Sequence, residues 1–119
     1  MLDIKKLLTK ILVHITPTTI YNTKTTAPST QSSYTYASIP SLANHNIVIV
    51  QAYTSNISQN LVFCRDFGNT PIYLFDNNGT YIRGGFLVDW TNNRIGVRWV
   101  NGTSSTADTI YFQKVIGVL

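Results

Sequence analysis

The sequence predicts a mainly β fold, in which a jelly-roll-like antiparallel β-sandwich forms a head carried on a short N-terminal α-helix. Three observations support this prediction. Short β-branched and aromatic runs alternate with Asn- and Gly-containing turns from residue 46 onward, apolar residues follow a heptad spacing near the N-terminus, and a Thr- and Ser-rich stretch lies between. The expected organisation is an oligomerisation helix at 1–15, a neck at 16–45 and a β-sandwich head at 46–119.

Apolar residues in the first segment recur at intervals of three and four, which is the spacing of a heptad seam. The seam residues are Met1, Ile4, Leu8, Ile11 and Ile15. Leucine at the a position and isoleucine at the d positions favour three or four strands over two. We therefore expect a homo-oligomer, with a trimer favoured, in which Ile4, Leu8, Ile11 and Ile15 form the contact. Thr16-Pro17 is expected to end the helix, because a residue before proline avoids the α region.

Two other interpretations of this helix remain open. It can pack on its own β-domain, or it can lie on a membrane surface as a basic amphipathic helix, because Lys5, Lys6 and Lys10 accompany the apolar stripe. Helices of this length are marginal in isolation. The rest of the chain is therefore expected to contribute to any assembly.

The neck, residues 16–45, is expected to be loosely structured, with one or two edge strands. In the head, β-branched and aromatic runs predict strands at 47–54, 61–67, 71–76, 80–90, 94–100 and 109–118. Predicted turns lie at 58–60, 68–69, 77–79, 92–93 and 101–102, where Asn and Gly tolerate positive φ. Gly84-Gly85 within a long strand suggests a bulge or corner.

The predicted strands differ in how their apolar residues alternate. Residues 94–100 alternate cleanly, so that Arg94 and Arg98 share the face opposite the apolar one. Residues 47–53, 61–66 and 71–75 are apolar on both faces. A strand in a two-sheet sandwich has one buried face. We therefore expect a second copy of the chain to cover the other face, in a head-to-head trimer that shares its axis with the helix bundle.

Charge and cysteine content argue against several kinds of protein. The net charge is +4, but three lysines lie in the first ten residues and the rest is close to balanced. No stretch interleaves basic residues with exposed aromatics, so we expect no nucleic-acid partner. Cys64 is the single cysteine, which excludes an intrachain disulfide and a Cys-rich metal site. No apolar run reaches the ~18 residues of a membrane span.

Residues that could carry catalysis are few, and we expect no enzyme, no metal and no cofactor. His14 and His45 have no partner at a spacing that would make a zinc site or a triad. Asp76 and Asp89 stay open as the two carboxylates of a glycosidase. Asp76 opens an Asn-Asn-Gly sequence, however, which favours a turn-capping role.

Aromatic side chains interspersed with Asn, Asp and Arg offer flat apolar faces beside hydrogen-bond donors, a combination that suits sugar rings. The candidate ligand-binding residues are Tyr81, Arg83, Trp90, Arg94 and Arg98. Tyr53 and Tyr73 belong to the same set of aromatics. The competing interpretation places most of these aromatics in the core or in an interface, and for Trp99 we favour the core.

The chain has three parts in order: a helix of the Met-Leu-Asp-Ile-Lys-Lys-Leu-Leu-Thr-Lys-Ile-Leu type, a Thr/Ser-rich neck and a β-head that ends in an apolar strand. This layout resembles that of small tail-fibre or receptor-binding proteins encoded by phages and prophages of gut Firmicutes. The resemblance covers the layout of the whole chain. It implies a homotrimer in the virion, at the phage tail, whose distal β-domain binds a bacterial cell-surface glycan or protein receptor. It supplies no residue-level binding motif.

Two other functions stay open. The first is a structural virion assembly or decoration protein without a small ligand. The second is a membrane-surface or secreted bacterial protein whose basic helix docks on lipid.

Overall fold

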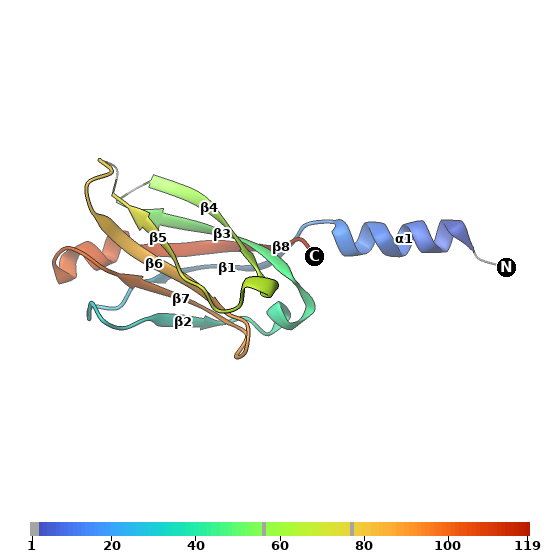
Figure 1. The fold of residues 1–119 in the computed structure, drawn as a ribbon, viewed down its shortest axis with the longest axis horizontal. Helices are drawn as coiled ribbons and strands as arrows, with labels where there is room; N and C mark the ends of the chain where they lie inside the picture. Colours follow the sequence, from blue (N-terminus) through green and yellow to red (C-terminus); the bar gives the residue numbers. More distant parts are fainter. Residues whose placement is uncertain (1–2, 56, 77) are drawn as a thin grey trace.

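Two four-stranded antiparallel sheets pack face to face, and an α-helix extends from one end of this head (Figure 1). The computed structural model describes residues 3–55, 57–76 and 78–119, with the side chains of 13–15 excepted. Sheet A has the order β1 (Thr18–Thr26), β8 (Tyr111–Gly117), β3 (Ile47–Thr54) and β4 (Ile57–Cys64). Sheet B has the order β2 (Thr35–Ser38), β7 (Arg94–Trp99), β6 (Ile82–Asp89) and β5 (Ile72–Phe75).

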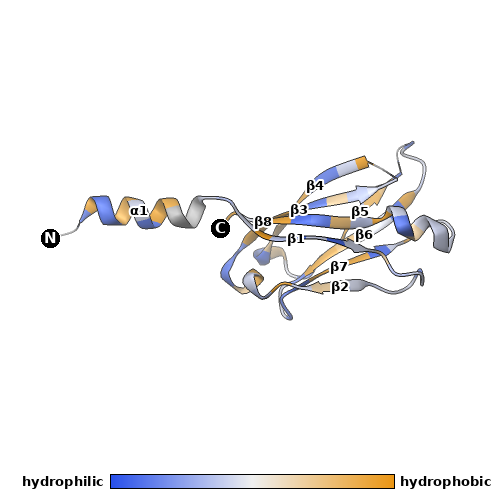
Figure 2. Cartoon of the chain, turned by 180° about the vertical axis from the view of Figure 1, so that it is seen from behind, coloured by the Kyte–Doolittle hydropathy of each residue, from blue (hydrophilic) through white to orange (hydrophobic). Residues whose placement is uncertain are grey.

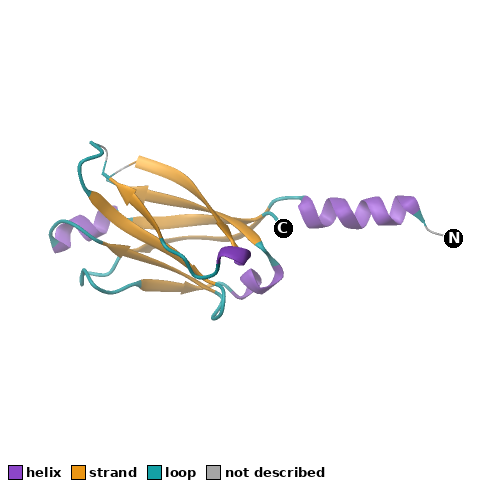
Figure 3. Ribbon diagram, viewed as in Figure 1, coloured by secondary structure: helices purple, strands orange, loops and turns teal. Residues whose placement is uncertain are grey.

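The strand pairing confirms the predicted jelly-roll-like antiparallel sandwich with a short N-terminal helix. The first strand, β1, pairs with the last, β8, and β2 pairs with β7. The intervening strands form the local pairs β3–β4, β5–β6 and β6–β7. Three short 3-10 helices, η1 (Pro40–Asn44), η2 (Arg65–Phe67) and η3 (Ser104–Thr109), lie at the ends of the head. Figure 3 places η3 at the end away from the long helix.

Helix α1 (Ile4–Ile15) begins and ends where its capping residues dictate. The Asp3 side chain accepts a hydrogen bond from the Lys6 backbone N–H at 3.1 Å, which satisfies one of the free donors of the first turn. The negative charge of Asp3 also complements the helix dipole. The extended conformation of Thr16 ends the helix before Pro17, as predicted.

The helix makes no close packing with the head. It projects along the long axis of the molecule (Figure 1), and every described side chain of residues 3–12 is exposed. Figure 2 shows apolar and polar segments alternating along it. The interpretation that α1 packs on its own β-domain is therefore wrong. Within the described side chains of residues 3–12, the apolar stripe is exposed in a single chain, and Leu8 is 53% exposed.

Residues 16–45, predicted as a neck with one or two edge strands, supply one edge strand to each sheet. β1 pairs with β8 from Thr18 to Thr26, and β2 pairs with β7 from Thr35 to Ser38. The sandwich therefore starts at Thr18. These two edge strands bury few large side chains. Their Thr- and Ser-rich sequence therefore looks like that of a connecting segment, although it forms strands.

The core lies between the sheets and is built from inward-pointing side chains of both. The largest fully buried apolar side chains are Phe86, Phe112, Leu42, Ile95 and Ile110. Trp99 is buried as well, as favoured from the sequence. Strand alternation supplies this core, with Val48, Val50 and Ala52 of β3 pointing inward.

The β3–β4 turn and the end of β4 differ from the sequence-based prediction. Residues 58–60, predicted as a turn, lie inside β4, because the pairing runs without a break from Ile47–Cys64 to Thr54–Ile57. Beyond the last pair, Thr54–Ile57, Ser55 adopts a φ of +50°, the positive φ that tight hairpins require. The predicted continuation of this strand through residue 67 is instead η2.

A substitution at Gly84 on β6 can test how tightly the two sheets pack. Its missing side chain points into the core, where a Cβ atom would lie 2.7 Å from Ile110 Cγ2 and 3.3 Å from Thr54 Cγ2. Overpacking of this kind costs roughly 1–3 kcal/mol, and we expect Gly84→Ala to lower the free energy of unfolding by that amount in urea denaturation. Gly85→Ala is the comparison variant, because its methyl group would point outward against the Tyr73 ring at 3.0 Å rather than into the core, and we expect a smaller loss. Equal effects of the two substitutions would contradict the assignment of the faces.

Candidate functional site

The outer face of sheet B gathers arginine and tyrosine side chains from three strands. Alternation along β7 turns Arg94, Gly96 and Arg98 outward while the residues between them enter the core. The strand pairing then places Tyr36 opposite Gly96 on one side. On the other side Gly85 of β6 lies opposite Arg98, and Tyr73 of β5 lies opposite Gly85.

These side chains form a row of cations and rings that we call the Arg–Tyr face, consisting of Arg94, Tyr36, Tyr34, Arg98 and Tyr73. Arg94 Cζ lies 3.7 Å from the centroid of the Tyr36 ring. The rings of Tyr36 and Tyr34 stack with centroids 5.7 Å apart and planes 28° apart. Arg98 Cζ lies 5.3 Å from the Tyr34 centroid and 5.6 Å from the Tyr73 centroid. The Arg98 guanidinium donates from Nη2 to the Tyr73 hydroxyl at 3.0 Å.

Two glycines make this arrangement possible. A Cβ atom on Gly96 would lie 2.7 Å from Tyr36 Cε1 and 2.9 Å from Tyr34 Cδ1. A Cβ atom on Gly85 would lie 3.0 Å from Tyr73 Cε1 and 3.5 Å from Arg98 Cγ. The tyrosine rings therefore lie over bare backbone, which brings Tyr73 and Arg98 together across β6.

Comparison of the chain with protein-family models, curated proteins and solved structures found no match.

The three arginines of sheet B differ in how their charges are balanced. Arg94 Nε lies 2.8 Å from Asp89 Oδ2, and Arg83 Nη2 lies 3.6 Å from Asp76 Oδ2. Arg98 has no carboxylate within 4.0 Å among the residues that the structure describes. The hydrogen bond to the Tyr73 hydroxyl raises the pKa of Arg98 despite the opposing effect of burial, so the guanidinium stays charged.

Asp89 holds the Arg94 side chain in place through an ion pair. Its Oδ1 accepts a hydrogen bond from Asn69 Nδ2 at 3.0 Å, and its Oδ2 accepts one from Arg94 Nε at 2.8 Å. Asn92 donates to both oxygens, from its backbone N–H at 3.3 Å and from Nδ2 at 2.9 Å. Burial alone would raise the pKa of Asp89, but the hydrogen bonds from Asn92 and Arg94 outweigh it and leave the pKa below its usual value.

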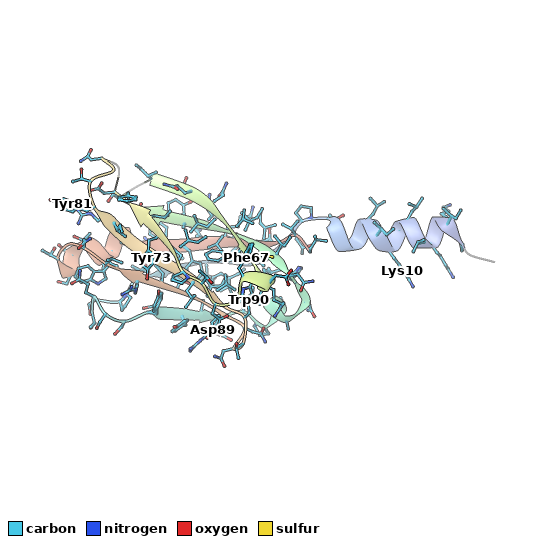
Figure 4. All side chains as sticks on the ribbon, viewed as in Figure 1. Lys10, Phe67, Tyr73, Tyr81, Asp89 and Trp90 are labelled. Carbon is cyan, nitrogen blue, oxygen red and sulfur yellow. The ribbon has the colours of Figure 1, made fainter. Side chains whose placement is uncertain are left out.

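The structure separates the five residues that the sequence suggested for ligand binding. Arg94 and Arg98 belong to the Arg–Tyr face. Tyr81 and Arg83 lie farther along sheet B, with Arg83 Cζ 5.5 Å from the Tyr81 ring centroid, and Tyr81 lies at the end of the head away from α1 (Figure 4). Trp90 is only 6% exposed, so its indole belongs to the core.

Arg65 covers Trp90 at the end of the head nearest α1. Its Cζ lies 4.6 Å from the Trp90 ring centroid. Its Nη2 also donates to the carbonyl oxygens of Leu42 and His45, each at 2.7 Å. These hydrogen bonds give Arg65 a role in closing the sandwich.

Tyr34 and Tyr36 are site residues that the sequence analysis did not select. Both lie in the segment predicted as a neck, in a Tyr34-Thr35-Tyr36 run whose alternation is typical of a short strand. The signal that could have identified them is the match between this Tyr-x-Tyr pattern and Arg94-x-Gly-x-Arg98 on the neighbouring strand. Burial raises the pKa of Tyr34 against the opposing effect of Arg98, so Tyr34 remains a neutral hydrogen-bonding group.

The carboxylates at the two ends of β6 cannot face one another as a glycosidase pair. Asp76 contacts Arg83, and Asp89 lies six residues farther along the same strand, which is roughly 20 Å at strand rise. Glycosidase carboxylates stand ~5–10 Å apart. Asp76 instead accepts hydrogen bonds from the backbone N–H groups of Asn78 and Thr80 at 3.2 and 3.0 Å, the turn-capping role expected from the sequence.

Neither a metal cluster nor a membrane-spanning helix is found in the described part of the chain. No three His, Cys, Asp or Glu side chains of residues 3–55, 57–76 and 78–119 are grouped to hold a metal ion. No helix in these same ranges has the length and apolar character to cross a bilayer.

The outer face of sheet A is apolar near α1. The strand pairing aligns Thr19, Ile116, Ile49 and Val62 in one row across all four strands. Val62 is 60% exposed. A shallow hollow of about 270 Å³ on this face is lined by Ile49, Gln51, Asn60, Lys114 and Ile116. The row starts two residues after Pro17, close to the end of α1.

Proposed function

We propose that the chain is a self-associating adhesion head, trimeric through α1 and the outer face of sheet A, that binds a bacterial cell-surface saccharide through the Arg–Tyr face. This assigns it a role like that of the phage tail-fibre and receptor-binding proteins whose layout it resembles, at the tail of a virion. The observation that carries the binding proposal is the row of stacked tyrosines and guanidinium groups on the outside of sheet B.

The Arg–Tyr face has the chemistry of a saccharide site. Tyrosine rings offer flat apolar surfaces on which the C–H groups of a sugar can lie, and their hydroxyls provide hydrogen bonds. Guanidinium groups add fixed donors for sugar oxygens. Tyr73 is 41% exposed, so a ligand can reach the rings. The contacts with Arg94 and Arg98 hold the rings in place before binding, which reduces the entropy cost of association.

Self-association is supported by two exposed apolar surfaces, one on α1 and one on the outer face of sheet A. The helix stripe leaves Ile4, Leu8 and Ile11 exposed in a single chain. The row containing Ile49, Val62 and Ile116 continues this apolar character on sheet A. With these surfaces on the symmetry axis, sheet B of every copy faces outward. Three Arg–Tyr faces on one oligomer would raise the avidity for a repetitive cell surface.

Gly96→Ala tests the binding proposal without removing any polar group. The added methyl group must displace Tyr34 and Tyr36, whose rings lie under 3 Å from its position. We expect about a tenfold loss of affinity, equivalent to ~1.4 kcal/mol, with little change in melting temperature because both rings are at the surface. The measurement is an array of bacterial surface saccharides probed with the labelled oligomer, followed by calorimetric titration of each saccharide retained.

Ser104→Ala in η3 is the control, because it removes an exposed polar group outside the Arg–Tyr face and outside the outer face of sheet A. An unchanged affinity in a folded Gly96→Ala variant would move the site away from the Arg–Tyr face. A folded oligomer that binds neither the array nor intact bacteria would overturn saccharide binding. That result would favour the alternative of a structural assembly or decoration protein, for which the apolar surfaces of α1 and sheet A suffice.

A further inference from the structure

We propose that the saccharide bound by the Arg–Tyr face is acidic, and that its carboxylate or phosphate group pairs with Arg98. This inference rests on the proposed function of the face and specifies the class of ligand. It is drawn from the charge balance, hydrogen bonding and surroundings of Arg98.

Arg98 is the arginine of sheet B whose charge is not balanced by the protein in the described ranges. Arg94 and Arg83 each have an aspartate partner, at 2.8 and 3.6 Å. Because these two charges are already compensated, an anion approaching sheet B is attracted most strongly to Arg98. The net charge of +4 favours this approach over longer distances.

Arg98 also keeps hydrogen-bonding capacity beyond its contacts with the hydroxyls of Tyr73 and Tyr34. A guanidinium carries five N–H donors, and the hydrogen bond found for Arg98 uses Nη2 to reach the Tyr73 hydroxyl. Its Nε is buried, so an anion from solvent would contact the η nitrogens. A carboxylate or phosphate can supply two acceptor oxygens to one guanidinium in a bidentate contact.

The surroundings of Arg98 favour a sugar as the carrier of the charge. Tyr34 and Tyr73 flank the guanidinium at 5.3 and 5.6 Å. Tyr36 extends the aromatic surface by stacking on Tyr34. A pyranose ring seated on these tyrosines would place a charged substituent over Arg98. Gly85 and Gly96 leave room for the tyrosine rings to lie over the backbone, which brings the rings and Arg98 together into one surface for the sugar.

The test titrates four probes into the full-length oligomer by calorimetry: a galacturonate trisaccharide, glucose 6-phosphate, a neutral galactose trisaccharide and a short polyglutamate peptide. We expect at least one of the two acidic sugars to bind ten or more times more tightly than the neutral trisaccharide. Tighter binding of galacturonate would identify a carboxylate ligand, and tighter binding of glucose 6-phosphate a phosphate ligand.

Arg98→Gln is expected to lower the affinity for the preferred acidic sugar by 10- to 100-fold and to leave the neutral trisaccharide within about twofold. Arg98→Lys keeps the charge and most of the stem but loses the planar pair of donors, so we expect an intermediate loss. Lys6→Gln removes the same unit of charge from the exposed side of α1, away from the seam, and is expected to change neither affinity. Circular dichroism and thermal melting of each variant check that it is folded.

The outcomes separate this inference from the proposed function. If the neutral trisaccharide binds as tightly as the acidic sugars and Arg98→Gln weakens neither, the ligand is not acidic but saccharide binding stands. If polyglutamate equals the better acidic sugar, attraction of any polyanion or an acidic peptide replaces the proposal. If no sugar binds here and the array is blank, both proposals fail.

Discussion

Leu8→Lys is expected to convert the proposed trimer into a monomer. Leu8 lies at an a position of the seam, next to the d positions Ile4 and Ile11, and its side chain is exposed in the single chain. In a trimer the substitution would bring three ammonium groups together in an apolar layer, where uncompensated charge is strongly destabilising. We expect the dissociation constant of the oligomer to rise at least 100-fold.

The measurement is light scattering coupled to gel filtration at micromolar concentration. The mass is expected to fall from about 40 kDa, three times the chain mass of 13.3 kDa, to that of one chain. The head should remain folded, because the helix makes no close packing with it. Circular dichroism and the melting temperature of the head check this directly.

Thr9→Lys is the matched control, since it adds the same charge one residue along the helix, at a b position away from the seam. We expect it to leave the oligomer intact. A wild-type protein that is monomeric under these conditions would overturn the proposed trimer. Flotation of that monomer with anionic vesicles would then favour a membrane-surface helix. If Leu8→Lys leaves a trimer unchanged, the head alone holds it, and Ile49→Lys on sheet A is expected to dissociate it.

Asp89→Ala is expected to be the most damaging single substitution at the edge of the candidate site. Asp89 is 5% exposed, and its two oxygens receive the hydrogen bonds from Asn69, Asn92 and Arg94. Removing the carboxylate leaves these donors unpaired in a largely buried position. The loss is on the order of 2–3 kcal/mol, discounted because Arg94 is partly exposed.

The effect of Asp89→Ala depends on pH in a defined direction. Because the pKa of folded Asp89 is below its usual value, the carboxylate contributes its full stability above the unfolded pKa of ~3.9. This contribution is lost as the pH falls through the lower folded value. Urea denaturation is therefore expected to separate wild type and variant clearly at pH 7, and progressively less below pH 4.

Asp66→Ala is the control for this experiment, because Asp66 is exposed in η2 and its removal should alter stability little. Asp89→Asn keeps an acceptor oxygen and is expected to lose less than Asp89→Ala. A difference between wild type and Asp89→Ala that persists unchanged at pH 3 would contradict the assigned role of the charge. Asp76, whose pKa is lowered first by the backbone N–H of Thr80, titrates in both proteins and cancels from the comparison.

The elements that the sequence predicts well are those whose signals are local. Asp3 and Thr16-Pro17 bound the helix because capping and the restriction before proline involve adjacent residues. Alternation along 94–100 separates Arg94 and Arg98 from the core-facing residues of β7, as the structure confirms. The predicted bulge near Gly84-Gly85 corresponds to the register shift between β5 and β6.

The elements that it predicts poorly depend on partners far along the chain. Trp90 is a ligand-binding candidate from the sequence and Trp99 a core candidate, but both are buried in the packed sandwich. Residues 58–60 have the composition of a turn, but pairing with β3 draws them into β4. Tyr34 belongs to the candidate site because β2 lies beside β7, a pairing between segments that are more than 50 residues apart along the chain.

The amino-acid sequence by itself determined that this protein has an apolar helix stripe, a β-sandwich and outward-facing arginines, because each follows from the spacing of neighbouring residues along one element. The tertiary structure alone decided that Tyr36, Arg98 and Tyr73 share one surface and that Arg98 lacks a carboxylate in the described ranges while Arg94 has one. Those facts follow from which strands pair and in which register. That choice is made by the burial of the whole core, and no local pattern contains it.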